Sequence, residues 1–191
     1  MLQIDSEKNK IKKIINTFKT NLSLYSEHCL KIIDKQGKLK PLVFNEAQRL
    51  LDEQIEMQYS HQKRVRMLIL KARQTGISTY CQARGFWKTA TNQNLNAVVV
   101  SHLNESTKAI FSMVRNYYDN MPHPLVTPEL KESTSNSMAF THGSRWRIAT
   151  ARTGEVGRGW TTNYLHGSEV AFYPNADIIP SLLQTVPGNG V

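Results

Sequence analysis

The sequence is poor in the residues that define several protein classes. It has only two cysteines, Cys29 and Cys81, which lie far apart and without the spacing of zinc ligands, so a disulfide scaffold is excluded and free buried thiols are expected. No apolar run approaches the ~20 residues that a membrane-spanning helix needs. The first residues mix acids with lysines and lack the apolar region of a signal peptide. These absences predict a protein of the cytoplasm.

Two kinds of hydrolytic site are also missing. The six histidines are scattered, and none is paired with another ligand at metal-binding spacing. The stretch HGSEV at 166–170 lacks the G-x-S-x-G pattern of a nucleophile elbow. We therefore expect neither a hydrolase that depends on zinc alone nor one that uses a serine nucleophile.

Acidic residues are few relative to basic ones. The 191 residues include 24 Lys and Arg against 15 Asp and Glu, which gives a formal net charge of +9. This excess favours a polyanionic partner, nucleic acid before a membrane surface, although lysines that only solvate the surface are the alternative. The length is enough for one domain with a core and an appendage.

Hydrophobic periodicity predicts alternating helices and strands. Residues 1 to about 33 have apolar positions at helical spacing, a hairpin follows around 34–37, and Asn45 is placed to cap a helix. The short apolar run Met67–Leu70 predicts a buried strand. After it we expect, in order, a helix at about 78–91, a strand within 94–102, a helix at 104–121, a hairpin around His142 and Gly143, a strand within 161–169 and a helical segment at 175–186. This alternation predicts an α/β fold with a parallel sheet flanked by helices.

The loop after this apolar run has the layout of a phosphate-binding P-loop. With Gly76 aligned on the last glycine of G-x-x-x-x-G-K-[ST], the loop reads K-A-R-Q-T-G-I-S. Ser78 stands at the position that reaches Mg²⁺, and the helix that follows directs N–H groups at a phosphate. Ile77 replaces the lysine, so we expect the cation from Arg73 or Lys71, with Arg73 preferred for its bidentate fork. A polar turn without a ligand is the alternative.

Two other places give weaker signals. The strand within 161–169 ends at Glu169, which is placed to orient water as a general base, with Ser168 where a metal-side aspartate is usual. An exposed glutamate at a strand end is the alternative. Upstream, the amide of Gln48 offers the donor and acceptor that match an adenine edge, and Phe44 is placed to pack on the ring. An ordinary helix start explains these two residues equally well.

The loop RTGEVGRGW at 152–160 contains an arginine between two glycines. It does not match G-x-G-x-x-G, which excludes a dinucleotide-binding fingerprint. Flanking glycines let the loop project Arg158 into the site of a neighbouring subunit or onto a phosphate backbone. A solvent-exposed loop arginine is the alternative.

The ordered set FNEAQ, LKARQTGIST, VVVSH, GRG and LHGSEVA resembles the N-terminal packaging ATPase of the large terminase subunit of tailed bacteriophages, from about residue 30 onward. The resemblance implies a P-loop NTPase of the additional-strand (ASCE, RecA-like) type, which uses ATP and Mg²⁺ to move double-stranded DNA into a procapsid. It implies Glu169 as the catalytic base, Arg158 as a finger that acts in trans, and Ser78 with Glu169 at the metal. The implied nucleotide contacts are Phe44, Gln48, Lys71, Arg73, Gln74, Thr75, Gly76, Ile77, Ser78 and Thr79.

The resemblance also implies an organisation and a set of partners. Residues 1–60 would be an N-terminal helical and hairpin extension that carries the adenine-side motif, and residues 61–191 an ATPase core that is incomplete at its C-terminal end. The expected partners are double-stranded DNA, a portal protein, a small terminase subunit and further copies of the chain in a ring, without a membrane. The expected location is the host cytoplasm, and transiently the portal of the procapsid.

The chain departs from the family pattern in three ways. Ile77 replaces the usual lysine, Ser168 replaces the metal-side aspartate, and no coupling motif or nuclease domain follows QTVPGNGV. We therefore expect a fragment or a truncated relative. Two alternatives stay open, namely a helicase-like ATPase that acts on nucleic acid and a catalytically silent module that binds nucleotide or DNA.

Overall fold

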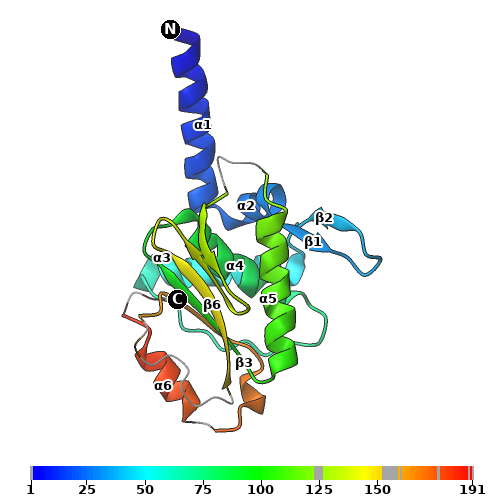
Figure 1. Cartoon of the computed structure of the whole chain (residues 1–191). Helices are drawn as coiled ribbons and strands as arrows, with labels where there is room; N and C mark the ends of the chain where they lie inside the picture. Colours follow the sequence, from blue (N-terminus) through cyan, green and yellow to red (C-terminus); the bar gives the residue numbers. More distant parts are fainter. Residues whose placement is uncertain are drawn as a thin grey trace.

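A five-stranded sheet forms the centre of the protein (Figure 1). The computed structural model describes residues 2–122, 127–151, 159, 161–175, 177–188 and 190. In spatial order the strands are β4 (Leu130–Ser133), β5 (Ser137–Phe140), β6 (Arg145–Thr150), β3 (Asn96–Ser101) and β7 (Tyr164–Gly167). β3 runs parallel to β6 and β7, whereas β5 is antiparallel to both of its neighbours. The α/β class is therefore confirmed, but the sheet is mixed and not wholly parallel.

Helices lie against both faces of this sheet. α4 (Ile77–Thr91) and α5 (Asn104–Asp119) cover one face, where the larger hydrophobic cluster lies, and the short α6 (Ile178–Gln184) covers the other. β3 contributes side chains to both clusters, because Val99 belongs to the first and Val98 to the second. This division follows from the two-residue side-chain period of a strand. An apolar strand buried on both faces is what the sequence predicted for this segment.

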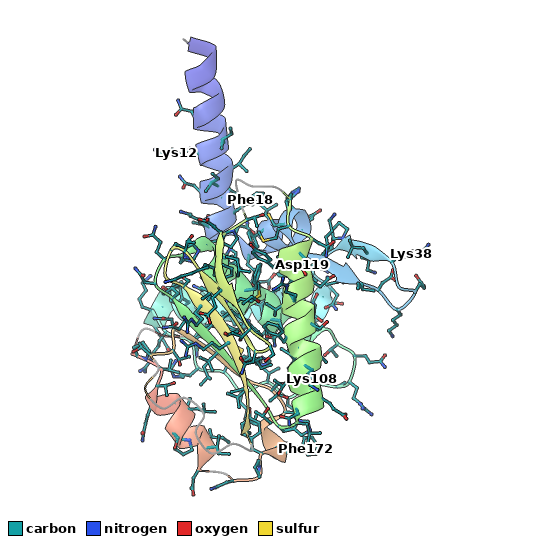
Figure 2. The ribbon with its side chains drawn as sticks, in the orientation of Figure 1. Lys12, Phe18, Lys38, Lys108, Asp119 and Phe172 are labelled. Atoms are coloured by element: carbon teal, nitrogen blue, oxygen red, sulfur yellow. The ribbon has the colours of Figure 1, made fainter. Side chains whose placement is uncertain are left out.

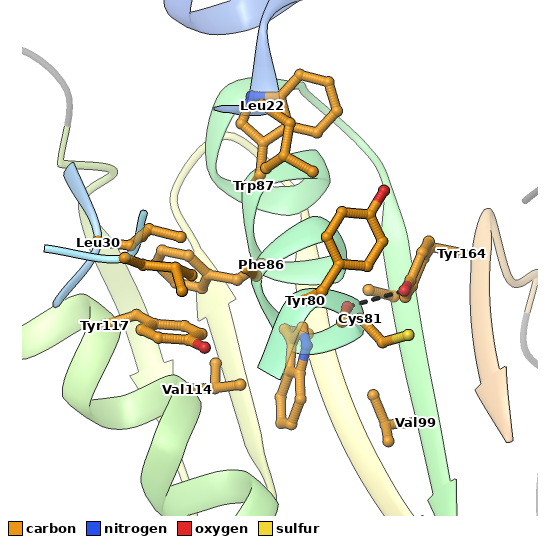
Figure 3. Close-up of a cluster of buried hydrophobic side chains, with 14 of the residues drawn as sticks. Leu22, Leu30, Tyr80, Cys81, Phe86, Trp87, Val99, Val114, Tyr117 and Tyr164 are labelled. Atoms are coloured by element: carbon orange, nitrogen blue, oxygen red, sulfur yellow. Dashed lines mark hydrogen bonds between the residues drawn. The ribbon is translucent and has the colours of Figure 1, made fainter. Parts of the chain in front are cut away.

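The contact between α4 and β7 is unusually close. The Tyr164 hydroxyl on β7 donates a hydrogen bond to the Cys81 carbonyl in the first half of α4, at 2.8 Å (Figure 3). At Gly85, one turn further on, a Cβ atom would lie 2.8 Å from the Tyr164 ring. A glycine inside a helix usually weakens it. Here the missing side chain lets the helix approach the strand.

The N-terminal region contains two helices and a hairpin. α1 (Leu2–Thr20) projects away from the sheet (Figure 1), and α2 (Leu22–Cys29) follows it directly. The single helix expected over residues 1–33 is therefore wrong, because Asn21 caps α2 by accepting a hydrogen bond from the Leu24 N–H. The expected hairpin is confirmed as β1 (Lys31–Ile33) and β2 (Leu39–Pro41), which pair antiparallel.

Residues before and after position 60 share one hydrophobic core. Leu30 and Phe44 from the first segment belong to the same buried cluster as Phe86 and Tyr117 from the second. The indole N–H of Trp87 on α4 also donates to the Phe18 carbonyl near the end of α1, at 2.7 Å. The N-terminal segment is thus built onto α4 and α5.

α3 (Glu46–Gln62) is tied to α4 by a buried polar network. The Arg84 side chain is 1% exposed and bonds to Asp52, at 3.0 Å, and to Glu56 on α3. The Tyr80 hydroxyl donates to the same Asp52 carboxylate, at 2.6 Å. Burial raises the pKa of Asp52 above its usual range, although the Tyr80 hydrogen bond and the Arg84 charge oppose this effect. A buried guanidinium is acceptable here because two carboxylates and a hydroxyl surround it.

The apolar run Met67–Leu70 is not a strand, contrary to expectation. It lies in an irregular stretch between α3 and α4, and the side chains of Leu68 and Leu70 are 89% and 101% exposed. The physical reason is the lack of a partner, since no strand pairs with this run in the part of the chain that the structure describes. The sequence also gave no indication of β4, which carries mostly exposed side chains.

None of the helices in the described part of the chain is both long enough and apolar enough to span a membrane.

The Arg84 network predicts unequal effects for its two acids. Asp52→Ala should lower the free energy of unfolding by about 2–4 kcal/mol, because it leaves a buried guanidinium and a buried hydroxyl short of an acceptor. Glu56→Ala is the matched control, and it should cost about 1 kcal/mol or less because the Glu56 side chain is 53% exposed. Urea unfolding of the two variants measures the difference, and equal losses would contradict the assignment.

Candidate functional site

The N-terminus of α4 presents free backbone donors. Gly76 is the N-cap residue and supplies no side-chain cap, and the first turn contains no acid. Tyr80 is the first residue whose N–H bonds back along the helix, to the Gly76 carbonyl at 3.0 Å. Among the described residues, the N–H groups of Ile77, Ser78 and Thr79 have no acceptor. Together with the helix dipole, such donors form a site for an anion.

The loop before α4 is held by the start of α3 and by the hairpin of β1 and β2. The Asn45 amide donates to the Thr75 carbonyl at 3.1 Å, and the Gln48 amide donates to the Gly76 carbonyl at 2.8 Å. At the hairpin tip, the Lys35 amine donates to the Gln74 side-chain oxygen at 2.9 Å. Gln74 and Gly76 both have left-handed backbone, with φ of 63° and 76°. These anchors fix the tight turn that directs the chain into α4.

The structure separates the predicted loop residues into two groups. Ile77, at the position of the missing lysine, is 7% exposed and belongs to the main core cluster. Lys71 and Arg73 are exposed, and in the described residues neither makes an ion pair or a hydrogen bond. Both cations are therefore free to meet a ligand. Which of them replaces the lysine stays a prediction.

Gln48 and Phe44 have structural partners. The Gln48 side chain is 3% exposed, and its oxygen accepts from the Asn45 N–H at 2.9 Å, which completes a capping box at the start of α3. The Phe44 ring is buried against Tyr80, with centroids 5.3 Å apart. Both residues thus support the junction of α3 and α4. Their predicted contact with adenine stays a prediction.

Glu169 lies just beyond the carboxyl end of β7 and contacts the histidine that follows β3. The Glu169 carboxylate oxygen is 2.9 Å from Nδ1 of His102, which directly follows β3. The His102 ring also packs on Phe172 in the 3₁₀ turn after Glu169, at 5.5 Å between centroids (Figure 2 labels Phe172). The Glu169 side chain is 49% exposed, so it can still meet water or a ligand.

His102 is a functional candidate that no sequence pattern singled out. The signal that points to it is topological. Two parallel neighbouring strands bring their carboxyl ends to one edge, so the residues that follow β3 and β7 must meet. The sequence could have indicated that His102 lies beside Glu169 only if β3 and β7 had been predicted to be adjacent and parallel.

The N-terminus of α4 lies at the same end of the sheet as Glu169. On α4, Gln82 bonds to His166 of β7 at 3.0 Å, and Gly85 lies against Tyr164. The helix therefore runs antiparallel to the strand. Four helical residues span ~6 Å and two strand residues ~6.6 Å, which places Ser78 level with Ser168, next to Glu169.

The metal-binding capacity of this region is small. Within the residues that the structure describes, no group of three or more His, Cys, Asp and Glu side chains is placed to hold an ion. Ser78 and Glu169 are the two side chains predicted at the metal. Mg²⁺ often takes only one or two protein ligands and completes its shell with phosphate oxygens and water. The donors present therefore fit a magnesium ion that arrives with a phosphate.

Arg158 lies outside the described residues, as do all positions from 152 to 158. Its predicted role as a finger stays a prediction.

No protein-family model matches the chain, and no curated protein matches it.

Because the backbone at Gly76 lies against the Gln48 side chain, we expect the effects of substitutions at these two residues on stability to be coupled. A Cβ atom at Gly76 would lie 2.8 Å from the Gln48 amide nitrogen, and the left-handed backbone adds about 1–2 kcal/mol of strain for any other residue. Gly76→Ala should therefore destabilise the protein by about 2–3 kcal/mol. In a Gln48→Ala background the same change should cost only the backbone strain. A urea-unfolding double-mutant cycle measures the coupling, and strictly additive losses would contradict the contact.

Because His166 is buried, we expect the protein to lose stability in mild acid. Burial first, and the Lys71 charge second, lower the pKa of His166 from 6.5 to about 4. Between these values the unfolded chain binds a proton that the folded protein does not, so stability should fall as pH decreases from 6.5 towards 4, by about 2 kcal/mol. Unfolding measured against pH should show a shallower slope for His166→Asn than for the natural protein. An unchanged slope would show that His166 titrates normally.

Proposed function

We propose that the chain binds ATP at the N-terminus of α4 and hydrolyses it, as the ATPase part of a terminase-like DNA-packaging motor. One observation carries this proposal, namely that the free N–H groups of Ile77–Thr79 and the carboxylate of Glu169 lie at the same end of the sheet. Hydrolysis of a phosphoanhydride requires a cradle for the phosphates and a group that orients water. This end of the sheet has residues suited to both.

Binding would use the backbone donors first. The N–H groups of Ile77, Ser78 and Thr79 would hold phosphate oxygens, and their number does not depend on the missing lysine. Arg73 and Lys71 would add charge from the exposed side of the loop. Ser78 would present its hydroxyl to a Mg²⁺ ion, which neutralises phosphate charge when bound.

Hydrolysis would depend on Glu169. Its carboxylate is half exposed and ends a strand beside the phosphate cradle, so it can accept a hydrogen bond and then a proton from the attacking water. Nδ1 of His102 lies 2.9 Å from that carboxylate. Arg158 from a neighbouring subunit would complete the charge on the transferred phosphate, which makes turnover dependent on assembly in a homo-oligomeric ring.

Double-stranded DNA is the polyanion that we propose as the motor's substrate. The net charge of +9 favours contact with a phosphate backbone and requires no base readout. Lys12, Lys13 and Lys19 are exposed on α1, which projects from the domain (Figure 2). A portal protein and a small terminase subunit would be the protein partners, in the host cytoplasm.

Two observations favour a second candidate, a module that binds nucleotide without hydrolysing it. Ile77 is buried in the core, and Ser168 offers no carboxylate at the metal side. With fewer charges around the phosphates, binding through backbone donors can persist while turnover is lost.

The ATP proposal predicts separate effects on binding and on hydrolysis. Arg73→Ala should weaken MgATP binding by about 10–100-fold, because a charge-assisted hydrogen bond to phosphate is lost. Glu169→Gln should bind MgATP about as well as the natural protein but reduce kcat about 100-fold or more. Calorimetric titration and phosphate release measure the two quantities.

Lys131→Ala is the matched control, because Lys131 is an exposed cation on β4 at the other edge of the sheet. It should leave both quantities unchanged. If the natural protein binds MgATP without turnover, with or without DNA, the silent module is correct. If it does not bind MgATP at millimolar concentration, the proposed site is wrong.

A further inference from the structure

The tip of the β1–β2 hairpin reaches the loop that leads into α4. At this tip the Lys35 ammonium donates a hydrogen bond to the side-chain oxygen of Gln74 at 2.9 Å, across 39 residues of sequence. Among the hydrogen bonds and ion pairs of the described residues, this bond is the one that joins the tip (residues 34–38) to another part of the chain. The hairpin thus brings a cation from a distant segment to the candidate site.

The backbone of this tip is well defined. Oδ1 of Asp34 accepts hydrogen bonds from the N–H groups of Gln36 and Lys38, each at 2.9 Å, and the Asp34 N–H donates to the Lys38 carbonyl at 2.9 Å. At the base of the hairpin, the Asn116 amide of α5 donates to the Lys31 carbonyl at 2.7 Å. A two-stranded hairpin is only marginally stable alone, so these bonds hold the tip in place beside the loop.

The charge of Lys35 is not neutralised by a neighbour. Gln74 is a neutral acceptor, and no carboxylate lies within ion-pair distance of Lys35 in the described residues, since Asp34 pairs with Lys40, at 3.8 Å. An ammonium has three N–H donors, and one of them serves Gln74. Lys35 is therefore an exposed cation with two donors left for a ligand.

Lys35 and Lys71 approach the loop from different sides. The Lys71 charge is close enough to β7 to lower the pKa of His166, after the larger effect of burial. The hairpin is held instead by α5, which packs on β6 and β3. At most ~11 Å of extended chain separates Gln74 from Ile77, and the left-handed backbone at Gln74 shortens this distance. A phosphate at the first N–H groups of α4 would therefore lie between cations.

Buried polar atoms also indicate a ligand at this end of the sheet. Gln82 and Ser101 are 0% exposed, and in the described residues neither the Gln82 side-chain oxygen nor the Ser101 hydroxyl has a hydrogen-bond partner. Gln82 lies one turn after Ser78 on the same side of α4, and Ser101 is the last residue of β3. Most buried polar groups in proteins are paired, so such atoms require bound water or a polar ligand. This observation is independent of the free donors of α4.

We propose that Lys35 is a phosphate-binding residue of this site and supplies, from the hairpin, the cation that position 77 does not present. Its role as a ligand rests on the nucleotide site of the proposed function. Before binding, Gln74 holds the ammonium beside the loop, which reduces the entropy lost when a phosphate arrives. On binding, the remaining N–H donors bond to phosphate oxygens, and these charge-assisted bonds are stronger than the bond to a neutral amide.

The test removes the charge of Lys35 and keeps its contact. Lys35→Gln can still donate to Gln74 but is neutral, so it should bind MgATP and magnesium tripolyphosphate about 10–30-fold more weakly, because a charge-assisted hydrogen bond is lost. Lys38→Gln is the matched control, since Lys38 is exposed on the same tip (Figure 2) and its side chain has no hydrogen bond or ion pair in the described residues. It should change either affinity by less than about twofold. Calorimetric titration measures both variants, and no loss in Lys35→Gln or an equal loss in the two would overturn the proposal.

Acetylation of lysines, followed by mass spectrometry, tests the contact in the natural protein. Bound tripolyphosphate should slow the acetylation of Lys35 and leave that of Lys38 unchanged, because only the Lys35 ammonium would be covered. Equal protection of the two lysines, or protection of neither, would contradict the contact.

The two polyphosphates separate this role of Lys35 from the nucleotide proposal. If MgATP binds equally to the natural protein and to Lys35→Gln, Lys35 is not a ligand and nucleotide binding stands. If tripolyphosphate binds and MgATP does not, a weaker affinity of Lys35→Gln for tripolyphosphate keeps Lys35 as a phosphate ligand while the nucleotide function fails. Binding of neither would overturn both.

Discussion

The left-handed turn at Gly76, with the Gln48 amide against its backbone, is the constraint on which the candidate site depends. No side chain fits there, since a Cβ atom would meet the Gln48 nitrogen at 2.8 Å. Gln48 in turn is fixed by its role in the cap of α3, where its oxygen accepts from Asn45. The starts of α3 and α4 are therefore one unit, and the first N–H groups of α4 are left free because no helical carbonyl precedes them.

The position of α4 along the sheet decides whether its free N–H groups lie near Glu169. Arg84 joins the helix to the acids of α3, and Gly85 lets it approach Tyr164 of β7. Both contacts lie at the centre of the helix, and a rigid helix transmits their position to its first turn. The result is that the N-terminus of α4 reaches the edge where Glu169 and His102 meet. Substitutions that shift this packing are expected to disturb the site although they lie ~10 Å or more from it.

The sequence predicted the elements whose signals are local. The cap at Asn45, the hairpin around residues 34–37 and the apolar strand β3 all follow from adjacent residues, and all are confirmed. The predictions that failed depend on which strands and side chains from distant parts of the chain lie beside one another. Met67–Leu70 has the composition of a buried strand, but composition does not show whether another strand is present to pair with it. In the same way, the contact between His102 and Glu169 depends on strand order, which no local pattern encodes.

The burial of Ile77 and the exposure of the loop cations have one cause, the orientation of α4. Ile77 shares a buried face with Tyr80, Cys81 and Arg84, at the spacing of 3, 4 and 7 residues that marks one side of a helix. A lysine at position 77 would start from this same face, directed into the core, and would have to bend around the first turn to reach an anion. Residues before Gly76 do not have this restriction, because the turn places them outside the helix. With α4 packed as it is, a cation for an anion at this N-terminus would have to come from a position other than 77, and the exposed loop residues Arg73 and Lys71 satisfy this condition.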